Sequence, residues 1–148
     1  MTDKSASFVY VTYIRTTPEK AFEAITRPDL ARRYWGHENV SADWQTGSGW
    51  QHVRADAART VDLVGKVISS DPPNKLVISW ANESQQDDPD QYSRVTFDIE
   101  PQDDMVKLTV THDDLQPGSG MCIAVGKGWP LVLSSMKSFL ETGRGFDL

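Results

Sequence analysis

Three histidines, His37, His52 and His112, are the residues of this chain whose chemistry is most useful near neutral pH. An imidazole can donate or accept a hydrogen bond and can serve as an acid or a base. Their spacings fit neither an HExxH pattern nor an i, i+4 pair, and Cys122 has no CxxC partner. We therefore expect no metal site.

His112 falls in register with Val106, Leu108 and Val110, three alternating apolar residues of a strand-like segment. This register predicts that the imidazole points toward the apolar side at the end of a strand. It would there donate a hydrogen bond to a ligand or act as an acid or base. The competing interpretation is a structural histidine bonded to a carbonyl or carboxylate near the strand end.

His52 alternates with Trp50 and Arg54, which would place one aromatic and two polar side chains on one face. An inward face would bind an anion or a carbonyl group, and an outward face would be a solvated rim. Alternation alone does not decide between these, because Val53 points the other way.

The chain has five tryptophans, and several could line a cavity for an apolar or aromatic ligand. Ordinary packing in the core and hairpins is the competing interpretation. Trp80 shares a face with Leu76 and Ile78, and Trp129 lies on a helical stripe, so these two are the strongest pocket candidates. The full set of candidate ligand-binding residues is Trp35, Trp50, His52, Trp80, His112, Trp129, Leu133 and Met136.

Other catalytic arrangements find no support in the pattern. No G-x-S-x-G elbow is present, and Ser134 and Ser135 are expected on the polar or flanking side of a helix. No GxGxxG follows a strand, so no dinucleotide cofactor is expected. The acidic residues of segment 83–91 are typical of a solvated, mobile loop. We assign no catalytic residue.

The C-terminal segment predicts a long amphipathic helix that ends at Gly143, the expected left-handed stop. We favour a helix from about Met121 to Thr142, kinked at Pro130, over one that starts at Lys127. Its apolar residues fall at helical spacing: Trp129, Val132, Leu133, Met136 and Leu140.

The rest of the chain predicts one strand, two short helices and then strands. Residues 8–15 are rich in β-branched and aromatic side chains, and the next helix has Thr16 or Thr17 as N-cap with Pro18 in its first turn. Segment 27–35 repeats that pattern. The expected later strands are 38–44, 49–54, 60–70, 75–81, 92–100 and 105–113. Their alternation predicts an antiparallel sheet with one buried face, which the long helix would cover.

Composition narrows the function class. With 148 residues the chain is most simply one domain, and its net charge of −6 without a Lys/Arg cluster argues against nucleic-acid binding. No stretch is apolar enough to span a membrane, and the N-terminus lacks a signal-peptide core. One cysteine favours the reducing cytoplasm. A homodimer is one of the oligomeric states that the sequence allows.

Several stretches resemble the activator of heat-shock-protein-90 ATPase homologue family, the AHSA-like branch of the START-like (SRPBCC) superfamily. They run from residue 16 to residue 143: TPEKAFEAIT-RPDL, Tyr34-Trp35, DWxxGSGW, GKVISSDPPNKLVISW, LTVTHDDL and GWPLVLSSMKSFLETG. The resemblance implies an α+β helix-grip fold of order β-α-α-β6-α, with a core of about residues 8–143. A curved antiparallel sheet of about seven strands would enclose a cavity beneath the C-terminal helix.

The resemblance alone selects no function, because that superfamily includes ligand carriers, cyclases and a co-chaperone domain. Our leading hypothesis is binding of a small, largely hydrophobic or aromatic molecule in that cavity. One alternative is a cyclase- or hydrolase-like enzyme that uses His52 or His112. The other is a protein-interaction module that stimulates a heat-shock ATPase, which predicts an exposed apolar patch.

Overall fold

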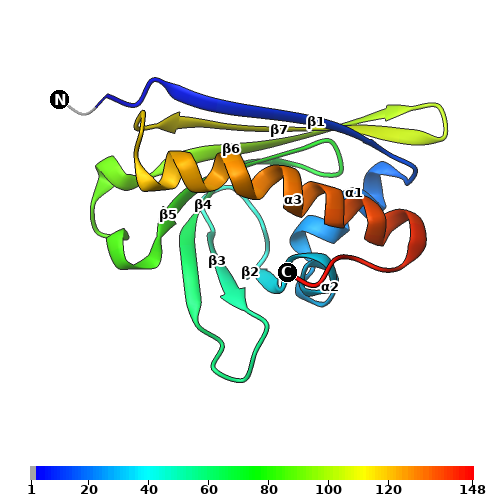
Figure 1. Cartoon of the computed structure of the whole chain (residues 1–148), viewed down its shortest axis with the longest axis horizontal. Coiled ribbons are helices and arrows are strands. Elements are labelled where there is room, and N and C mark those ends of the chain that lie inside the picture. The colour runs from blue at the N-terminus through cyan, green and yellow to red at the C-terminus, as the bar shows by residue number, and fades with distance from the viewer. Residues whose placement is uncertain (1–2) are drawn as a thin grey trace.

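The computed structural model, which describes residues 3–148, contains one curved antiparallel sheet of seven strands in the order β1-β7-β6-β5-β4-β3-β2. Three α-helices accompany the sheet (Figure 1). The predicted α+β helix-grip architecture and its β-α-α-β6-α order are confirmed. The strands are β1 (Ala6–Ile14), β2 (His37–Ser41), β3 (Gly49–Arg54), β4 (Val61–Asp71), β5 (Lys75–Asn82), β6 (Ser93–Gln102) and β7 (Met105–Leu115).

Helices α1 (Pro18–Thr26) and α2 (Pro28–Trp35) begin where the sequence predicts. The Thr17 side chain accepts a hydrogen bond from the backbone N–H of Lys20, which caps α1. Both helices start with proline, whose missing N–H would have no helical partner at that position. Gly36 ends α2 with a left-handed φ of 72°. Trp35 and His37 therefore flank a sharp change of direction.

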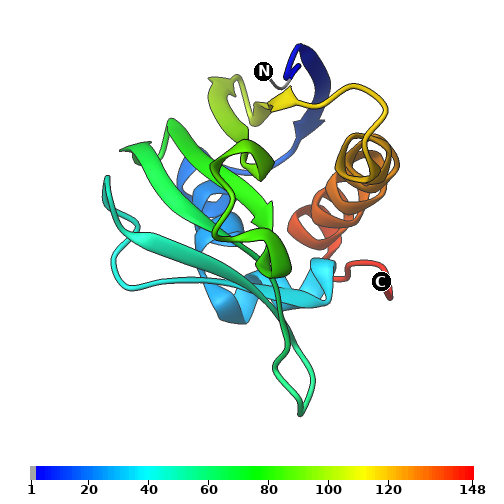
Figure 2. The same cartoon turned by 90° about the vertical axis from the view of Figure 1, so that its left-hand side faces the viewer.

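The two short helices connect opposite edges of the sheet, because β1 and β2 are the outermost strands. The third helix, α3 (Gly120–Thr142), packs against β1, β7, α1 and α2. Figure 2 shows α3 along the open side of the curved sheet. The space between β5 and α3 is thus bounded by strands on one side and by the end of α2 on another.

The expected alternation is found in β6 from Ser93 to Ile99 and in β7 from Val106 to His112, where every second residue is buried. Their apolar residues pack in the same core as the inner stripe of α3. Burying this face removes much apolar surface from water and holds the helix on the sheet. The residues concerned are Val95, Phe97, Ile99, Val106, Leu108, Val110, Trp129, Leu133 and Met136.

Helix α3 starts at Gly120, so the alternative start at Lys127 is wrong. The Ser119 side chain accepts a hydrogen bond from the N–H of Cys122 at 3.1 Å and caps the first turn. Pro130 lies inside the helix, and the kink expected there stays a prediction. Gly143 ends the helix with φ 86°, as the sequence indicates.

One expectation about the side chains of α3 is wrong. Ser135 is fully buried instead of lying on the polar side. Its hydroxyl donates to the carbonyl of Tyr34 and accepts from the N–H of Phe146, at 2.6 and 2.8 Å. Phe139 is buried, whereas Leu140 is only partly buried. Because α3 packs against both the sheet and the two short helices, it buries a wider stripe of residues than a single apolar row predicts.

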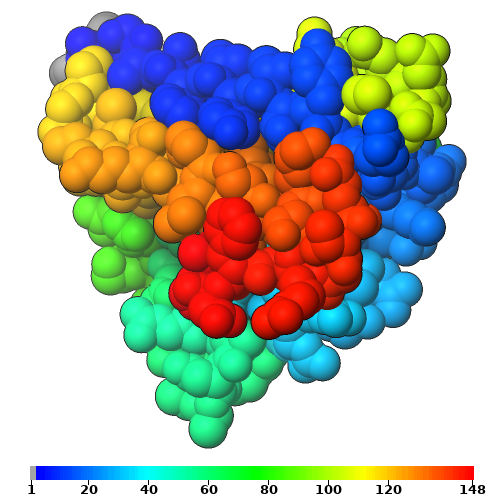
Figure 3. Space-filling model, turned by 45° about the vertical axis from the view of Figure 1, so that its right-hand side comes forward, coloured from blue at the N-terminus to red at the C-terminus, as the bar shows by residue number. Residues whose placement is uncertain are grey.

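Two other segments also differ from expectation. The segment after β5 is exposed but forms two short 3₁₀ turns, Glu83–Gln85 and Pro89–Gln91, where a loop was expected. Residues 144–148 lie beyond the expected core, yet they fold back along α3 (Figure 3). The backbone of Gly145 lies so close to Arg33 that an added Cβ would sit 2.7 Å from its carbonyl oxygen.

Replacing Gly126 with alanine should stabilise the protein by about 0.5–1 kcal/mol, because glycine inside a helix loses more backbone entropy on folding. The new Cβ would meet only Phe8, at 3.9 Å, which is an ordinary contact. Urea unfolding followed by circular dichroism measures the change. Gly145→Ala is the contrasting variant and should lose stability, since its Cβ meets backbone atoms. Equal stabilisation by both changes would contradict this packing.

Candidate functional site

A pocket of about 290 Å³ lies between α3 and strands β4 and β5. One stripe of α3 forms one wall, because the spacing of its residues keeps them on one helical face. The sheet and the end of α2 supply the aromatic and polar residues opposite. The helix residues are Met121, Ala124, Val125, Gly128, Trp129 and Val132, and the others are Trp35, His37, His52, Asp62, Leu63, Trp80 and Asn82.

The inner wall of the pocket is an aromatic cluster drawn from four elements. The Trp129 ring centroid lies 5.6 Å from Trp35 and 5.5 Å from Trp80. His52 meets Trp35 edge to face, with centroids 4.7 Å apart. Trp50 packs behind Trp80 at 5.4 Å. Tilted and edge-to-face rings at these separations attract one another, so these contacts stabilise the wall.

Trp50 and Trp80 differ in what their indole N–H groups do. The Nε1–H of Trp50 donates to the carbonyl oxygen of Ser79 at 2.8 Å. The buried Nε1–H of Trp80 has no hydrogen-bond partner within residues 3–148. A buried donor without a partner has a free-energy cost, so an acceptor that reaches it would stabilise the complex.

His52 is 3% exposed and is held by a chain of hydrogen bonds. The side-chain N–H of Asn39 donates to the carbonyl of Ile25 at 2.8 Å, which turns its amide oxygen toward His52 Nδ1 at 2.6 Å. The His52 ring stacks on His37, with centroids 4.2 Å apart. Burial, with a smaller effect of His37, lowers the pKa of His52 to about 3.

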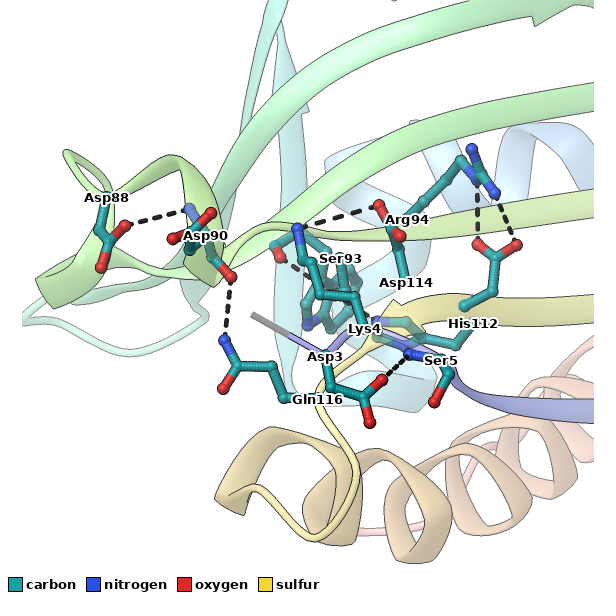
Figure 4. Close-up of polar contacts among 12 residues, drawn as sticks. Asp3, Lys4, Ser5, Asp88, Asp90, Ser93, Arg94, His112, Asp114 and Gln116 are labelled. Atoms are coloured by element: carbon teal, nitrogen blue, oxygen red, sulfur yellow. Dashed lines mark hydrogen bonds and ion pairs between the residues drawn. The ribbon is translucent and has the colours of Figure 1, made fainter. Parts of the chain in front are cut away.

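A second chain of hydrogen bonds fixes His112, which is fully buried. The indole N–H of Trp129 donates to His112 Nδ1 at 3.0 Å, so Nε2 carries the proton and faces the Ser93 hydroxyl at 2.7 Å. Ser93 in turn donates to the carbonyl of Trp80 at 3.1 Å. Figure 4 shows Ser93 beside His112, with the Arg94 side chain pointing away from both. Burial lowers the pKa of His112 to about 4.

Within residues 3–148, the one carboxylate in the pocket lining is that of Asp62, whose side chain is 29% exposed. Asp62 meets His37 Nε2 at 2.9 Å and accepts from Arg54 Nε at 2.8 Å. The Arg54 hydrogen bond lowers the pKa of Asp62, and His37 adds to this. Arg54, proposed as part of an anion site with His52, is exposed and committed to Asp62 instead. Its charge is therefore not offered to the pocket interior.

The structure brings together only part of the expected ligand-binding set. Trp35, His52, Trp80 and Trp129 line the pocket. Trp50 and His112 lie in a second layer, each in contact with a lining tryptophan. Leu133 and Met136 lie in the core outside the pocket lining. His112 is fully buried, and its partners are a hydroxyl and an indole, where the structural alternative expected a carbonyl or a carboxylate.

Several lining residues were missed by sequence reasoning. Met121 and Val125 continue the Trp129 stripe backward by eight and four residues, so the helical spacing could have found them. His37 and Asp62 had no such signal, because their meeting depends on the pairing of β2, β3 and β4.

A wider depression of about 680 Å³ lies among β2, β3, β4 and the segment after β5. Polar side chains such as Gln51, Lys66 and Gln86 contribute much of its lining. The smaller pocket is the better candidate for an apolar ligand, because small-molecule sites are mostly apolar with few polar groups. Within the described residues, no three His, Cys, Asp or Glu side chains gather as a metal site would require.

Lowering the pH from 7 to 5.5 should reduce the free energy of unfolding by about 2–3 kcal/mol through His52 and His112 together. Both have folded-state pKa values below the ordinary 6.5. The unfolded chain therefore binds protons in this window that the folded protein does not. The stabilisation is complete above pH 6.5 and is lost as pH falls toward 4. Urea titrations at the two pH values measure it.

The control for this pH dependence is His52→Phe, which removes one of the two titrating groups. Its loss of stability between the same pH values should be about half that of the unaltered protein. A free energy of unfolding that stays constant from pH 7 to 5.5 would contradict the buried, neutral state of both rings.

A family model described as Activator of Hsp90 ATPase homolog 1-like protein matches residues 15–141. The Aha1 dimer from Colwellia psychrerythraea is a similar solved structure, with 20% identity, a TM-score of 0.77 and coverage of 95% of this chain and 99% of that chain. CalU16 from Micromonospora echinospora has 21% identity and a TM-score of 0.70, with coverage of 93% and 77%.

An HSP90 activator from Plasmodium falciparum also has a similar structure, with 22% identity and a TM-score of 0.61. The alignment covers 94% of this chain and 89% of that chain. At these identities the likeness concerns the fold. No curated protein sequence matches the chain. Among the helices of residues 3–148, none is long and apolar enough to cross a membrane.

Proposed function

The chain belongs to the family of Activator of Hsp90 ATPase homolog 1-like proteins, and from its aromatic pocket we propose that it binds a small, largely apolar aromatic molecule. The observation that carries this proposal is the pocket of about 290 Å³ with three tryptophans in its lining. Its volume is near the lower end of the range for small-molecule sites, so the ligand has one or two rings.

The lining supports an apolar ligand held by ring contacts. Trp35 and Trp129 meet edge to face, and Trp80 is tilted against Trp129. A flat ring placed among them gains offset or edge contacts with each face. Leu63, Val125 and Val132 complete the apolar surface. Removing this surface and the ligand from water supplies the driving force.

Acid–base catalysis by the two histidines is less well supported. A catalytic base works best when its pKa lies near the operating pH. The pKa values of His52 and His112 fall to about 3 and about 4. Protonation of His112 would also set an N–H against the indole N–H of Trp129. The geometry therefore supports a binding role for the pocket over the enzymatic alternative.

A second candidate is a co-chaperone-like role, as the family suggests. The observation that favours it is an exposed apolar row on β1: Val9, Val11 and Tyr13, with 56%, 44% and 43% of their surface exposed. These residues alternate on one face of an edge strand. Exposed apolar rows mark interaction surfaces. A second copy of this chain is a further proposed partner, since the similar Colwellia protein is a dimer.

Val11→Lys tests the role of the β1 row. It should abolish stimulation of a purified heat-shock ATPase, or shift a dimer to a monomer in light scattering, without changing ligand binding. Equal stimulation and equal mass in the variant would exclude the β1 row as the contact.

The single free cysteine, Cys122, is consistent with the cytoplasm as the proposed compartment.

Titration with naphthalene, followed by tryptophan fluorescence and calorimetry, tests the binding function. We expect saturable one-to-one binding in the micromolar range, with quenching because tryptophans line the pocket. Absence of a saturable signal up to the solubility limit of naphthalene would contradict the proposal.

A further inference from the structure

The protonation of His52 is determined by the groups behind it. The carbonyl of Ile25 can only accept, so the Asn39 side-chain nitrogen must face it. The amide oxygen of Asn39 then faces His52 Nδ1, at 2.6 Å. That oxygen can only accept, so Nδ1 carries the proton. In the neutral ring, Nε2 is left as a lone pair.

Nothing within residues 3–148 donates a hydrogen bond to this lone pair. The only hydrogen bond of the His52 side chain found there is the one to Asn39. The ring lines the pocket, with Trp35 on its edge and His37 stacked at 4.2 Å. This lone pair is therefore available to a hydrogen-bond donor that enters the pocket.

We propose that the ligand is an aromatic alcohol whose hydroxyl group donates a hydrogen bond to Nε2 of His52. This inference rests on the proposed function, because it names the chemical class that the same pocket accepts. It assigns His52 as the residue that determines specificity, while the tryptophans supply affinity for the ring.

The surroundings favour a neutral donor over a charged one. A carboxylate would face the lone pair of His52 and, at the rim, the carboxylate of Asp62. An ammonium group would have to leave water for walls formed mostly by Trp80, Trp129 and aliphatic side chains, at a high desolvation cost. A hydroxyl group has a small desolvation cost and fits one acceptor.

The neutral state of the ring is maintained across the physiological range. Burial lowers the pKa of His52 to about 3, and the neighbouring His37 adds to this. Asp62 acts in the opposite direction, and its charge is shared with Arg54 and His37. Nε2 therefore remains an acceptor at pH 7.

The test compares 2-naphthol with 2-methoxynaphthalene, which retains the rings and the oxygen but cannot donate. Calorimetric titration of the full chain should show about tenfold tighter binding of 2-naphthol, because the methoxy compound leaves His52 unpaired. In His52→Phe, which retains an aromatic ring without the lone pair, the two compounds should bind equally.

Long-range ¹H–¹⁵N NMR of the ligand-free protein supplies a test that needs no variant. It should show His52 protonated at Nδ1 and unprotonated at Nε2 at pH 7. A proton on Nε2 would overturn the inference. Equal affinity of the unaltered protein for both compounds would overturn it while leaving the binding function intact. Failure of both compounds to bind would overturn the binding function and the inference together.

Discussion

The Gly128→Leu variant should bind naphthalene about 100-fold more weakly or not at all, because overfilling a packed site costs several kcal/mol. Gly128 lines the pocket from α3, and a Cβ there would meet no atom within 4 Å. The leucine side chain thus extends into the space that the ligand would occupy. Its stability should equal or exceed that of the unaltered protein by up to about 1 kcal/mol, since leucine is the better helix former.

Gly126→Ala is the matched control for this loss of binding. Gly126 lies two residues earlier on the same helix and faces Phe8 instead of the pocket. The control should gain helix stability and retain full affinity. Titration of both variants separates a filled pocket from a general effect on α3. Unchanged affinity of Gly128→Leu would place the ligand elsewhere.

Gly65→Ala should destabilise the protein by about 4 kcal/mol or more, because backbone atoms stand where the new methyl group would go. The Cβ would lie 1.8 Å from the carbonyl oxygen of Ser79 and 2.5 Å from Nε1 of Trp50. These two atoms form the hydrogen bond that crosses β4 at 2.8 Å. The variant must therefore separate β4 from β5 and displace the tryptophan behind Trp80.

Gly49→Ala provides the comparison in the neighbouring strand. Its Cβ would meet only the carbonyl of Gly65, at 3.9 Å. We expect a change within about 0.5 kcal/mol, as for other surface substitutions. Urea unfolding with near-UV circular dichroism reports stability and tryptophan packing in both variants. Similar stability of the two would show that Trp50 does not cross over Gly65.

Local signals were sufficient for the helices and for most strands. Thr17-Pro18, Pro28 and Gly143 mark helix ends because caps and proline act within one turn. The alternation of β6 and β7 reports which face is buried, since strand periodicity is local. These features need no knowledge of distant contacts.

The orientation of His52 could not be predicted from alternation. A register shift lies between His52 and Val53 where β3 pairs with β4, and both side chains are buried. A bulge breaks the period of two, so neighbouring residues can both be buried. Asn39 and Ile25, which fix the ring, come from a different strand and helix.

The burial of Ser135 on α3 likewise could not be predicted from the local sequence pattern. Its polar side chain suggested the solvated face, but it is buried between Tyr34 and Phe146. Tertiary hydrogen bonds decide such a position, and the one to Tyr34 spans 101 positions of the chain. The assembly of His37, Asp62 and Arg54 at the rim likewise depends on strand register instead of spacing.

Native mass spectrometry of the protein and of Gly128→Leu, both purified from the organism that makes the protein, shows whether this pocket holds a ligand in the cell. We expect one small aromatic hydroxyl compound on the unaltered protein and the bare polypeptide mass for the variant. A bare mass for the unaltered protein, or the same bound compound on both, would contradict the claim that this pocket binds the ligand.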